Sequence, residues 1–167
     1  MRFSLLPKIM TESLTDLTPQ FLKDNGIDLL LLDFDNTIVP YTTDTPTPQM
    51  EAWLTGVQEA GIRLCVVSNS HKDRVKHFCR ERGIVCITHS RKPFAKGIRQ
   101  ALAQFPEAAG HCALAGDQIF TDVLGANCAG VTSILVKPIN NHNFWLKARH
   151  VLEQPFIYLA RKRRMKP

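Results

Sequence analysis

Residues 28–37 read DLLLLDFDNT, four consecutive leucines followed by two carboxylates, an asparagine and a threonine. An aliphatic run of this kind, stopped abruptly by charge, predicts a buried strand. Side chains two positions apart in an extended segment point the same way, so Asp33 and Asp35 are expected to converge just past the strand. A lone Asp-x-Asp is equally well explained as a turn, and the rest of the sequence has to separate the two interpretations.

Outside this segment, hydrophobic runs of strand length alternate with segments of helical period. The alternation predicts an α/β protein, a Rossmann-like three-layer α/β/α sandwich around a parallel sheet of about five strands. Gly61, Gly83 and Gly130 stand where helix C-caps belong. The expected strands are 28–34, 62–68, 84–88, 111–115 and 131–136. The expected helices are 48–60, 71–82, 94–104 and 119–128, preceded by a short helix from Pro19 to near Gly26 and followed by 144–152, which Pro155 is expected to stop.

Polar side chains follow three more of the expected strands. Ser68 and Asn69 come after the second strand, Lys92 after the third, and Asp117 with Asp122 after the fourth. Taken singly, the serine and the aspartates are ordinary helix caps and the lysine is an ordinary surface charge. The carboxyl ends of parallel strands meet at one edge, however, and open α/β sheets bind ligands there. The clustering of these residue types therefore predicts a site.

Several carboxylates at one edge repel one another unless a cation joins them. Oxygen ligands without a suitably spaced His or Cys favour a hard ion, so Mg²⁺ is the expected cofactor. A carboxylate such as Asp33 can attack phosphorus, which gives an aspartyl-phosphate and divides one difficult displacement into two easier ones. Asp35 can then protonate the leaving alcohol and later deprotonate water.

The order of these residues resembles the four motifs of haloacid dehalogenase-like phosphatases, over roughly residues 10 to 140. The details are most similar to the YqeG-type subclass IIIA phosphatases, which are in turn similar to phosphatidylglycerophosphate phosphatases. These details are the Asn-Thr pair after the second aspartate, Ser-Asn after the second strand, Arg-Lys-Pro at 91–93, and GDQIFTDVLG at 116–125.

The resemblance implies that Asp33 is the nucleophile and a metal ligand. Asp35 would be the acid and base, with its backbone carbonyl on the metal, and Asp117 would complete the protein's share of the Mg²⁺ ligands. Asp122 is expected either to support the metal ligands without binding the metal itself or to hold Lys92 in place. Ser70 occupies a position where close relatives are expected to have asparagine. The implied phosphate-binding residues are Thr37, Ser68, Asn69 and Lys92.

The gaps between the motifs leave no room for a cap domain. A loop, one helix and one strand account for residues 38–67, and one helix and a short strand account for residues 69–91. An open site of this kind suits a substrate too large to enclose, or a lipid headgroup presented by a membrane. We expect residues 1–140 to form the phosphatase core with its N-terminal helix, and residues 141–167 to form a basic, aromatic-containing helix and tail of the same domain.

The net charge of +6 is concentrated at the end of the chain. Residues 1–136 carry 13 Lys+Arg against 14 Asp+Glu, whereas residues 137–167 carry 8 against 1. Apolar side chains are interleaved with these bases, as in interfacial anchors. The pattern predicts a phosphorylated lipid headgroup as partner, at an anionic membrane surface. Four alternatives remain open: a docked helix with a solvated charged end, nucleic acid bound through the tail, another soluble phosphate as substrate, and a non-catalytic module with the same fold.

The length of 167 residues fits one domain. The longest purely aliphatic stretch, Leu29–Leu32, is far too short to span a bilayer, and residues 1–10 lack the features of a secretory leader. The five cysteines lack disulfide or zinc spacing, and Cys65, Cys86 and Cys112 fall in apolar runs where burial is expected. These features predict a cytoplasmic protein, and the basic tail predicts peripheral association with the inner face of the membrane.

Overall fold

The computed structural model describes residues 3–140 and the helix at 144–161, and within that helix the side chains of residues 152–160. Its centre is a single sheet of six strands, in the order β1-β6-β5-β2-β3-β4, with every pair parallel. The expected three-layer α/β architecture is confirmed, with one strand more than expected. The strands are β1 (Ile9–Thr11), β2 (Leu29–Leu32), β3 (Arg63–Val67), β4 (Val85–Ile87), β5 (Cys112–Gly116) and β6 (Thr132–Val136).

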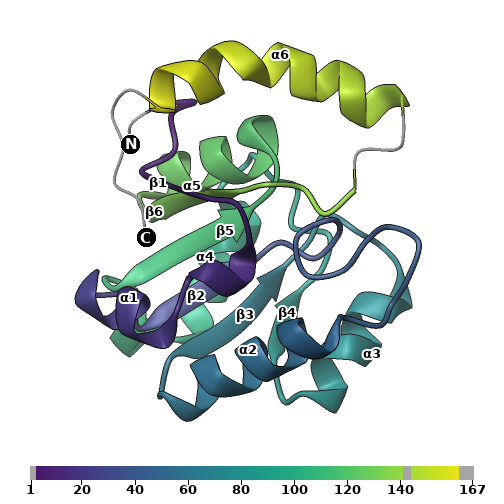
Figure 1. The fold of residues 1–167 in the computed structure, drawn as a ribbon. Helices are drawn as coiled ribbons and strands as arrows, with labels where there is room; N and C mark the ends of the chain where they lie inside the picture. The colour runs from purple at the N-terminus through teal and green to yellow at the C-terminus, as the bar shows by residue number, and fades with distance from the viewer. Residues whose placement is uncertain (1–2, 141–143, 162–167) are drawn as a thin grey trace.

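Helices cover both faces of the sheet (Figure 1). The helices α1 (Pro19–Asp24), α2 (Pro48–Glu59) and α3 (Asp73–Glu81) pack on the face that carries Leu30 and Leu32, whereas α4 (Lys96–Gln104) and α5 (Leu124–Ala129) pack on the face that carries Leu29 and Leu31. All four leucines are fully buried, and each burial contributes about 1.5–3 kcal/mol. The remaining elements are the 3₁₀ turns η1 (Leu14–Asp16) and η2 (Pro106–Ala108), the π-helical turn η3 (Ile119–Val123), and α6 (Phe144–Arg161).

A threonine followed by a proline begins both α1 and α2, and the sequence predicted this start for α1. Thr18 Oγ1 accepts a hydrogen bond from the N–H of Phe21 at 3.1 Å and precedes Pro19. The same arrangement begins α2, where Thr47 caps the N–H of Met50 before Pro48. Gly61, Gly83 and Gly130 have φ between +62° and +83°, the left-handed conformation that favours glycine just after a helix.

The strand order reverses beside β2. The chain runs from β2 outward to β3 and β4, and then returns to place β5 on the other side of β2. The carboxyl ends of β2 and β5 therefore mark the topological switch point, where doubly wound sheets bind ligands. The structure describes all of residues 33–95. A loop leads from β2 to α2, and α3 is the only element between β3 and β4, so no inserted domain covers the edge in this segment.

Two expectations about element boundaries are wrong. Ile9–Thr11 was not expected as a strand because three residues carry little periodicity, yet it pairs with β6 from Ile9 opposite Ile134. The helix expected at 119–128 is divided into η3 and α5, because the N–H groups of Asp122 and Val123 both bond to the carbonyl of Gln118.

Pro155 does not stop the last helix. The helix α6 continues to Arg161, although a proline inside a helix costs about 3 kcal/mol through its missing N–H and its ring clash. Pro155 lies on the exposed side, whereas Glu153, Ile157 and Ala160 are buried. These contacts lie on both sides of the proline and hold the two halves of the helix on the body. No helix in the described part of the chain has the length and apolar character needed to cross a membrane.

Candidate active site

Asp33 stands directly beyond the carboxyl end of β2. Its N–H donates to the carbonyl of Ala115 at 2.9 Å, so the ladder between β2 and β5 extends one residue past Leu32. Phe34 is fully buried next to it and packs edge-on against Phe78 of α3, with ring centroids 5.1 Å apart. The side chain of Asp33 is 9% exposed. The position expected for the nucleophile is therefore almost inaccessible to water.

Lys92 crosses the site to meet this carboxylate. Its Nζ lies 2.7 Å from Asp33 Oδ1 and 2.7 Å from Asp122 Oδ1, and its side chain is 1% exposed. Asn69 holds the lysine's backbone: its Oδ1 accepts from the N–H of Lys92 at 2.8 Å, and its Nδ2 donates to the carbonyl of Lys92 at 3.0 Å. Ser90 Oγ donates to the same Asn69 oxygen at 2.8 Å. The loops after β3 and β4 thus act together to place one ammonium group.

Burial decides the electrostatics of the pair. Desolvation raises the pKa of Asp33 to about 7; the Lys92 charge opposes this shift and the Asp122 charge adds to it. Burial alone would lower the pKa of Lys92, but Asp122 and Asp33 outweigh it and the net pKa lies above the ordinary value. One lysine therefore does not offset the negative charge of the site.

Three carboxylates form a buried cluster. One oxygen each from Asp33, Asp117 and Asp122 lies within 4.8 Å of the other two. Asp117 follows β5, and η3 turns Asp122 back until its Oδ2 accepts from the N–H of Gln118 at 3.0 Å. A Cβ on Gly116 would lie 2.3 Å from Asp122 Cγ, so only glycine leaves room for this carboxylate. Closely spaced hard oxygens with an excess of negative charge fit a divalent cation such as Mg²⁺.

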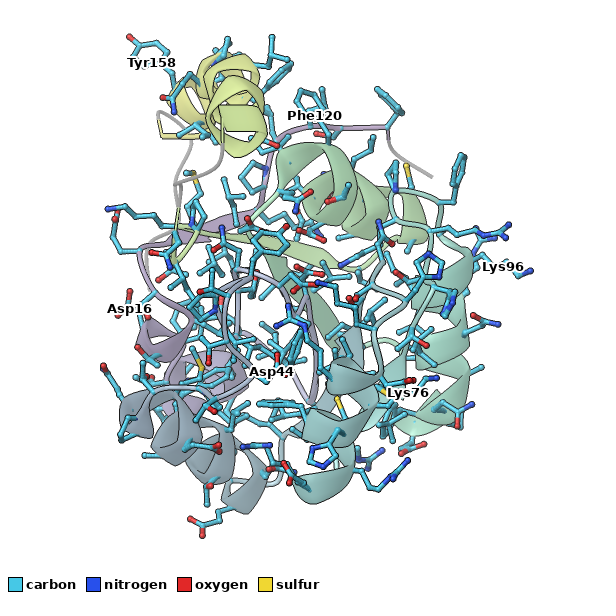
Figure 2. All side chains as sticks on the ribbon, turned by 90° about the vertical axis from the view of Figure 1, so that its right-hand side faces the viewer. Asp16, Asp44, Lys76, Lys96, Phe120 and Tyr158 are labelled. Atoms are coloured by element: carbon cyan, nitrogen blue, oxygen red, sulfur yellow. The ribbon has the colours of Figure 1, made fainter. Side chains whose placement is uncertain are left out.

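Asp35 pairs with a different cation from Asp33. The guanidinium of Arg74, in the first turn of α3, forms an ion pair with the Asp35 carboxylate. Arg74 also donates to Asp44 Oδ1 at 2.6 Å and to the carbonyl of Thr43 at 2.9 Å, and it lies 5.3 Å from the Phe34 ring centroid. A single partly buried arginine thereby joins the candidate acid and base to the loop between β2 and α2, near Asp44 in the middle of Figure 2.

The other expected site residues surround the same edge. Ser68 is buried and its Oγ accepts from the N–H of Ser70 at 3.0 Å. Thr37 is buried too, and its Oγ1 has no hydrogen-bond partner within the described residues. Asn36, which adopts a left-handed φ of 67°, donates to the carbonyl of Asn140 at 2.7 Å and accepts from the N–H of the same residue at 2.9 Å.

The structure thus brings Asp33, Lys92, Asp117 and Asp122 into direct proximity and places the Asp35 side chain beside Arg74. Sequence reasoning missed Arg74 and Asn36. Arg74 lies six positions after Ser68 in the first turn of a helix that begins at the active edge, and its place there is the signal that was available. Asn36 offered only its position directly after Asp35.

Comparison with known proteins decides the family. The family model described as mitochondrial PGP phosphatase matches residues 2–139. The chain is also 35% identical over 134 residues to "Probable phosphatase YqeG" of Bacillus subtilis, and this match covers 80% of the chain and 78% of the relative. The chain belongs to this phosphatase family. The expected membership among the YqeG-type phosphatases is confirmed, and with it the expectation of an enzyme that hydrolyses phosphoric monoesters.

Solved structures agree with this fold. A 3-deoxy-D-manno-octulosonate 8-phosphate phosphatase from Moraxella catarrhalis, in complex with magnesium ion, phosphate ion and KDO, superposes with a TM-score of 0.54 at 17% identity, over 86% of this chain and 98% of its own. A subfamily III A hydrolase of the haloacid dehalogenase superfamily from Legionella pneumophila superposes with a TM-score of 0.53 at 14% identity, over 77% and 73%. At these sequence identities, the two structures show that the fold is shared and nothing more.

Proposed function

We propose that this phosphatase uses Asp33 as its nucleophile, with Mg²⁺ as cofactor, and that its substrate is the phosphomonoester of a lipid headgroup, phosphatidylglycerophosphate. The observation that carries the catalytic part is the buried meeting of Asp33, Asp117 and Asp122 with Lys92. Such a cluster of acids is costly in a protein interior unless it binds a cation. The family description supports the substrate.

In the first step, an oxygen of Asp33 attacks phosphorus and the bond to the alcohol oxygen breaks. Asp35 donates a proton to the departing alcohol. In the second step, Asp35 takes a proton from water, the water oxygen bonds to phosphorus, and the bond to Asp33 breaks to release inorganic phosphate. Mg²⁺, held by Asp33, Asp117 and the backbone carbonyl of Asp35, would supply positive charge that offsets the carboxylates and the phosphoryl oxygens.

The phosphoryl oxygens need donors besides the cation. Lys92 supplies a fixed ammonium group, and Ser68, Thr37 and Asn69 stand at the same edge. The buried Thr37 Oγ1, which has no partner among the described residues, is suited to such a contact. The Asn69 amide also contacts the backbone of Lys92 through both of its polar atoms, so any help it gives to phosphate includes holding the lysine in place.

A lipid substrate is supported by the open edge and by the outer face of α6. Leu152, Tyr158 and Leu159 are 66%, 61% and 51% exposed on this helix. In Figure 2 Tyr158 projects away from the body of the protein. Phe156 and Ile157, by contrast, pack inward, so these two apolar residues of the helix serve the core. The basic residues of 162–166 lie outside the described residues, and their sequence complements an anionic leaflet.

A substrate panel tests the proposal. Phosphatidylglycerophosphate in mixed micelles, a sugar phosphate and a 5′-phosphorylated oligonucleotide are assayed with Mg²⁺ at equal enzyme concentration. We expect kcat/KM for the lipid to exceed the others by at least about tenfold, the equivalent of about 1.4 kcal/mol of transition-state binding. A faster reaction with the sugar phosphate or the oligonucleotide would remove the lipid assignment and leave the catalytic residues standing.

Vesicle co-sedimentation tests the surface separately. A variant with Leu152→Ser, Tyr158→Ser and Leu159→Ser is expected to bind anionic vesicles several-fold more weakly than the parent protein. Val85→Ser, which changes an exposed apolar residue on β4, is the matched control. Equal binding of the triple variant and the control would exclude α6 as the docking face.

A further inference from the structure

The helix α6 begins after the last residue that the family model matches, residue 139. It runs across the molecule next to β1, β6 and α5 (Figure 1). Ile157 packs in a cluster with Ile119, Val123 and Leu135, and the Phe156 ring meets Phe120 edge-on with centroids 6.1 Å apart. A helix outside the matched family segment therefore packs directly on η3, the turn that delivers Asp122.

Glu153 makes the polar part of this contact. It is 2% exposed, and its Oε1 accepts a hydrogen bond from the N–H of Ile119 at 2.9 Å. Residue 119 begins η3, where backbone N–H groups lack partners within the turn and favour a negative charge. Glu153 is the only acid in residues 137–167, among eight bases. The one carboxylate of a basic segment is thus buried against the acidic turn instead of lying in solvent.

The bonded N–H lies between two carboxylates of the acidic cluster. Asp117 precedes it by two residues and Asp122 follows it by three. Hydrogen bonds tie this backbone to Asp122: Gln118 donates its N–H to Asp122 Oδ2 at 3.0 Å, and its carbonyl accepts from the N–H groups of Asp122 at 2.9 Å and Val123 at 3.2 Å. A shift of Ile119 would act on both carboxylates, because the backbone that joins Asp117 to Asp122 runs through this residue.

We propose that Glu153 is a positioning residue, through which α6 fixes the turn from Asp117 to Asp122 and so sets the affinity of the acidic cluster for a divalent cation. The inference rests on the cation site proposed above. It adds a requirement for a helix that lies beyond the matched family segment.

Binding of Mn²⁺ to the full chain, followed by electron paramagnetic resonance, measures the effect without turnover. Mn²⁺ is the probe because it favours the same oxygen ligands as Mg²⁺. Glu153→Ala and Glu153→Gln both remove the charge, but only glutamine keeps an oxygen that can accept from Ile119. We expect binding about threefold weaker in the glutamine variant and about tenfold weaker in the alanine variant, because the alanine variant also leaves a buried N–H without an acceptor.

Two controls separate positioning from stability. Leu159→Ser changes the exposed side of the same helix, and Val57→Ala makes a cavity under α2 on the other face of the sheet. Val57→Ala is expected to lower Tm, and both controls should keep the Mn²⁺ affinity within twofold of the parent. If Val57→Ala weakens Mn²⁺ binding as much as Glu153→Ala does, the effect is one of general stability and the inference fails.

The remaining outcomes are equally decisive. Equal Mn²⁺ affinity in Glu153→Ala and Glu153→Gln overturns positioning through the hydrogen bond. If Glu153→Ala does not fold, the glutamine variant decides, and an affinity within the twofold range of the controls overturns the inference. If the parent protein itself binds no Mn²⁺, the proposed cation site fails and takes this inference with it.

Discussion

Lys92 and Asp33 form a buried ion pair, with Nζ 2.7 Å from Oδ1, although 59 positions separate them in the chain. The pair joins the loop after β4 to the end of β2. The same ammonium group also meets Asp122, so a single cation faces two carboxylates with almost no water present. One ammonium group between two carboxylates leaves the site with an excess of negative charge. Burial raises the pKa of Asp33, Lys92 opposes that rise and Asp122 adds to it.

Asp33→Asn is expected to lower hydrolysis of 4-nitrophenyl phosphate by about four orders of magnitude or more, because an amide does not attack phosphorus. Without cation the variant should unfold at the same or a higher temperature, since it loses a desolvated charge next to Asp122. Steady-state kinetics and thermal denaturation check both parts. Asp28→Asn, at the opposite end of the same strand, is the control and should keep its activity. Full activity in Asp33→Asn would remove the nucleophile assignment.

Arg74→Met should impair Asp35 more than it impairs the rest of the site. Without the guanidinium, Asp35 and the loop at Asp44 lose their common partner. An alkyl phosphate needs a proton donor for its leaving group far more than 4-nitrophenyl phosphate does, so kcat for the alkyl ester is expected to fall about 10²-fold and kcat for the aryl ester much less. Arg74→Lys should recover part of the loss. Equal losses for the two esters would show a purely structural role, and Lys76→Met, on the exposed side of α3, serves as control.

Gly116→Ala should destabilise the protein and reduce activity together. The added Cβ would lie 2.3 Å from Asp122 Cγ and 2.4 Å from Oδ2, so the carboxylate or the strand has to move. Overpacking of this kind costs about 1–3 kcal/mol, which urea denaturation can measure. Gly56→Ala inside α2 meets nothing within 4 Å and is expected to raise stability by about 0.5–1 kcal/mol. A Gly116→Ala protein as stable as the parent would contradict the close approach.

Alkylation should divide the five cysteines into two groups. Burial raises the pKa of Cys65 and of Cys112 to about 12, so at pH 8 about one thiol in ten thousand is ionised at each position. Burial also raises the pKa of Cys79. Iodoacetamide at pH 8 is therefore expected to label Cys86 and Cys128, which are partly exposed, before the other three. Peptide mass spectrometry checks the order, and labelling in urea should reach all five. Rapid labelling of Cys65 in the folded protein would refute its burial.

Much of the fold follows from local pattern. The four leucines of β2 and the strand-length runs after it predict parallel strands, and Thr18 with Pro19 predicts a helix start that the structure confirms. Short or irregular elements were not predicted. The strand β1 has only three residues, and η3 differs from a regular helix only in that one carbonyl accepts two N–H groups. The prediction that Pro155 stops the last helix was wrong. A proline inside a helix costs free energy locally, but the burial of Ile157 and Glu153 outweighs that cost.

The sequence by itself determined that carboxylates, a hydroxyl and a lysine follow successive strands, because strand period and chain order alone bring those residues to one edge. Only the tertiary structure decided that Asp35 meets Arg74, that Asn69 holds the backbone of Lys92, and that Glu153 reaches Ile119. Those partners are 23 to 39 residues apart. Their contact depends on how whole helices and loops pack against the sheet, which local periodicity does not encode.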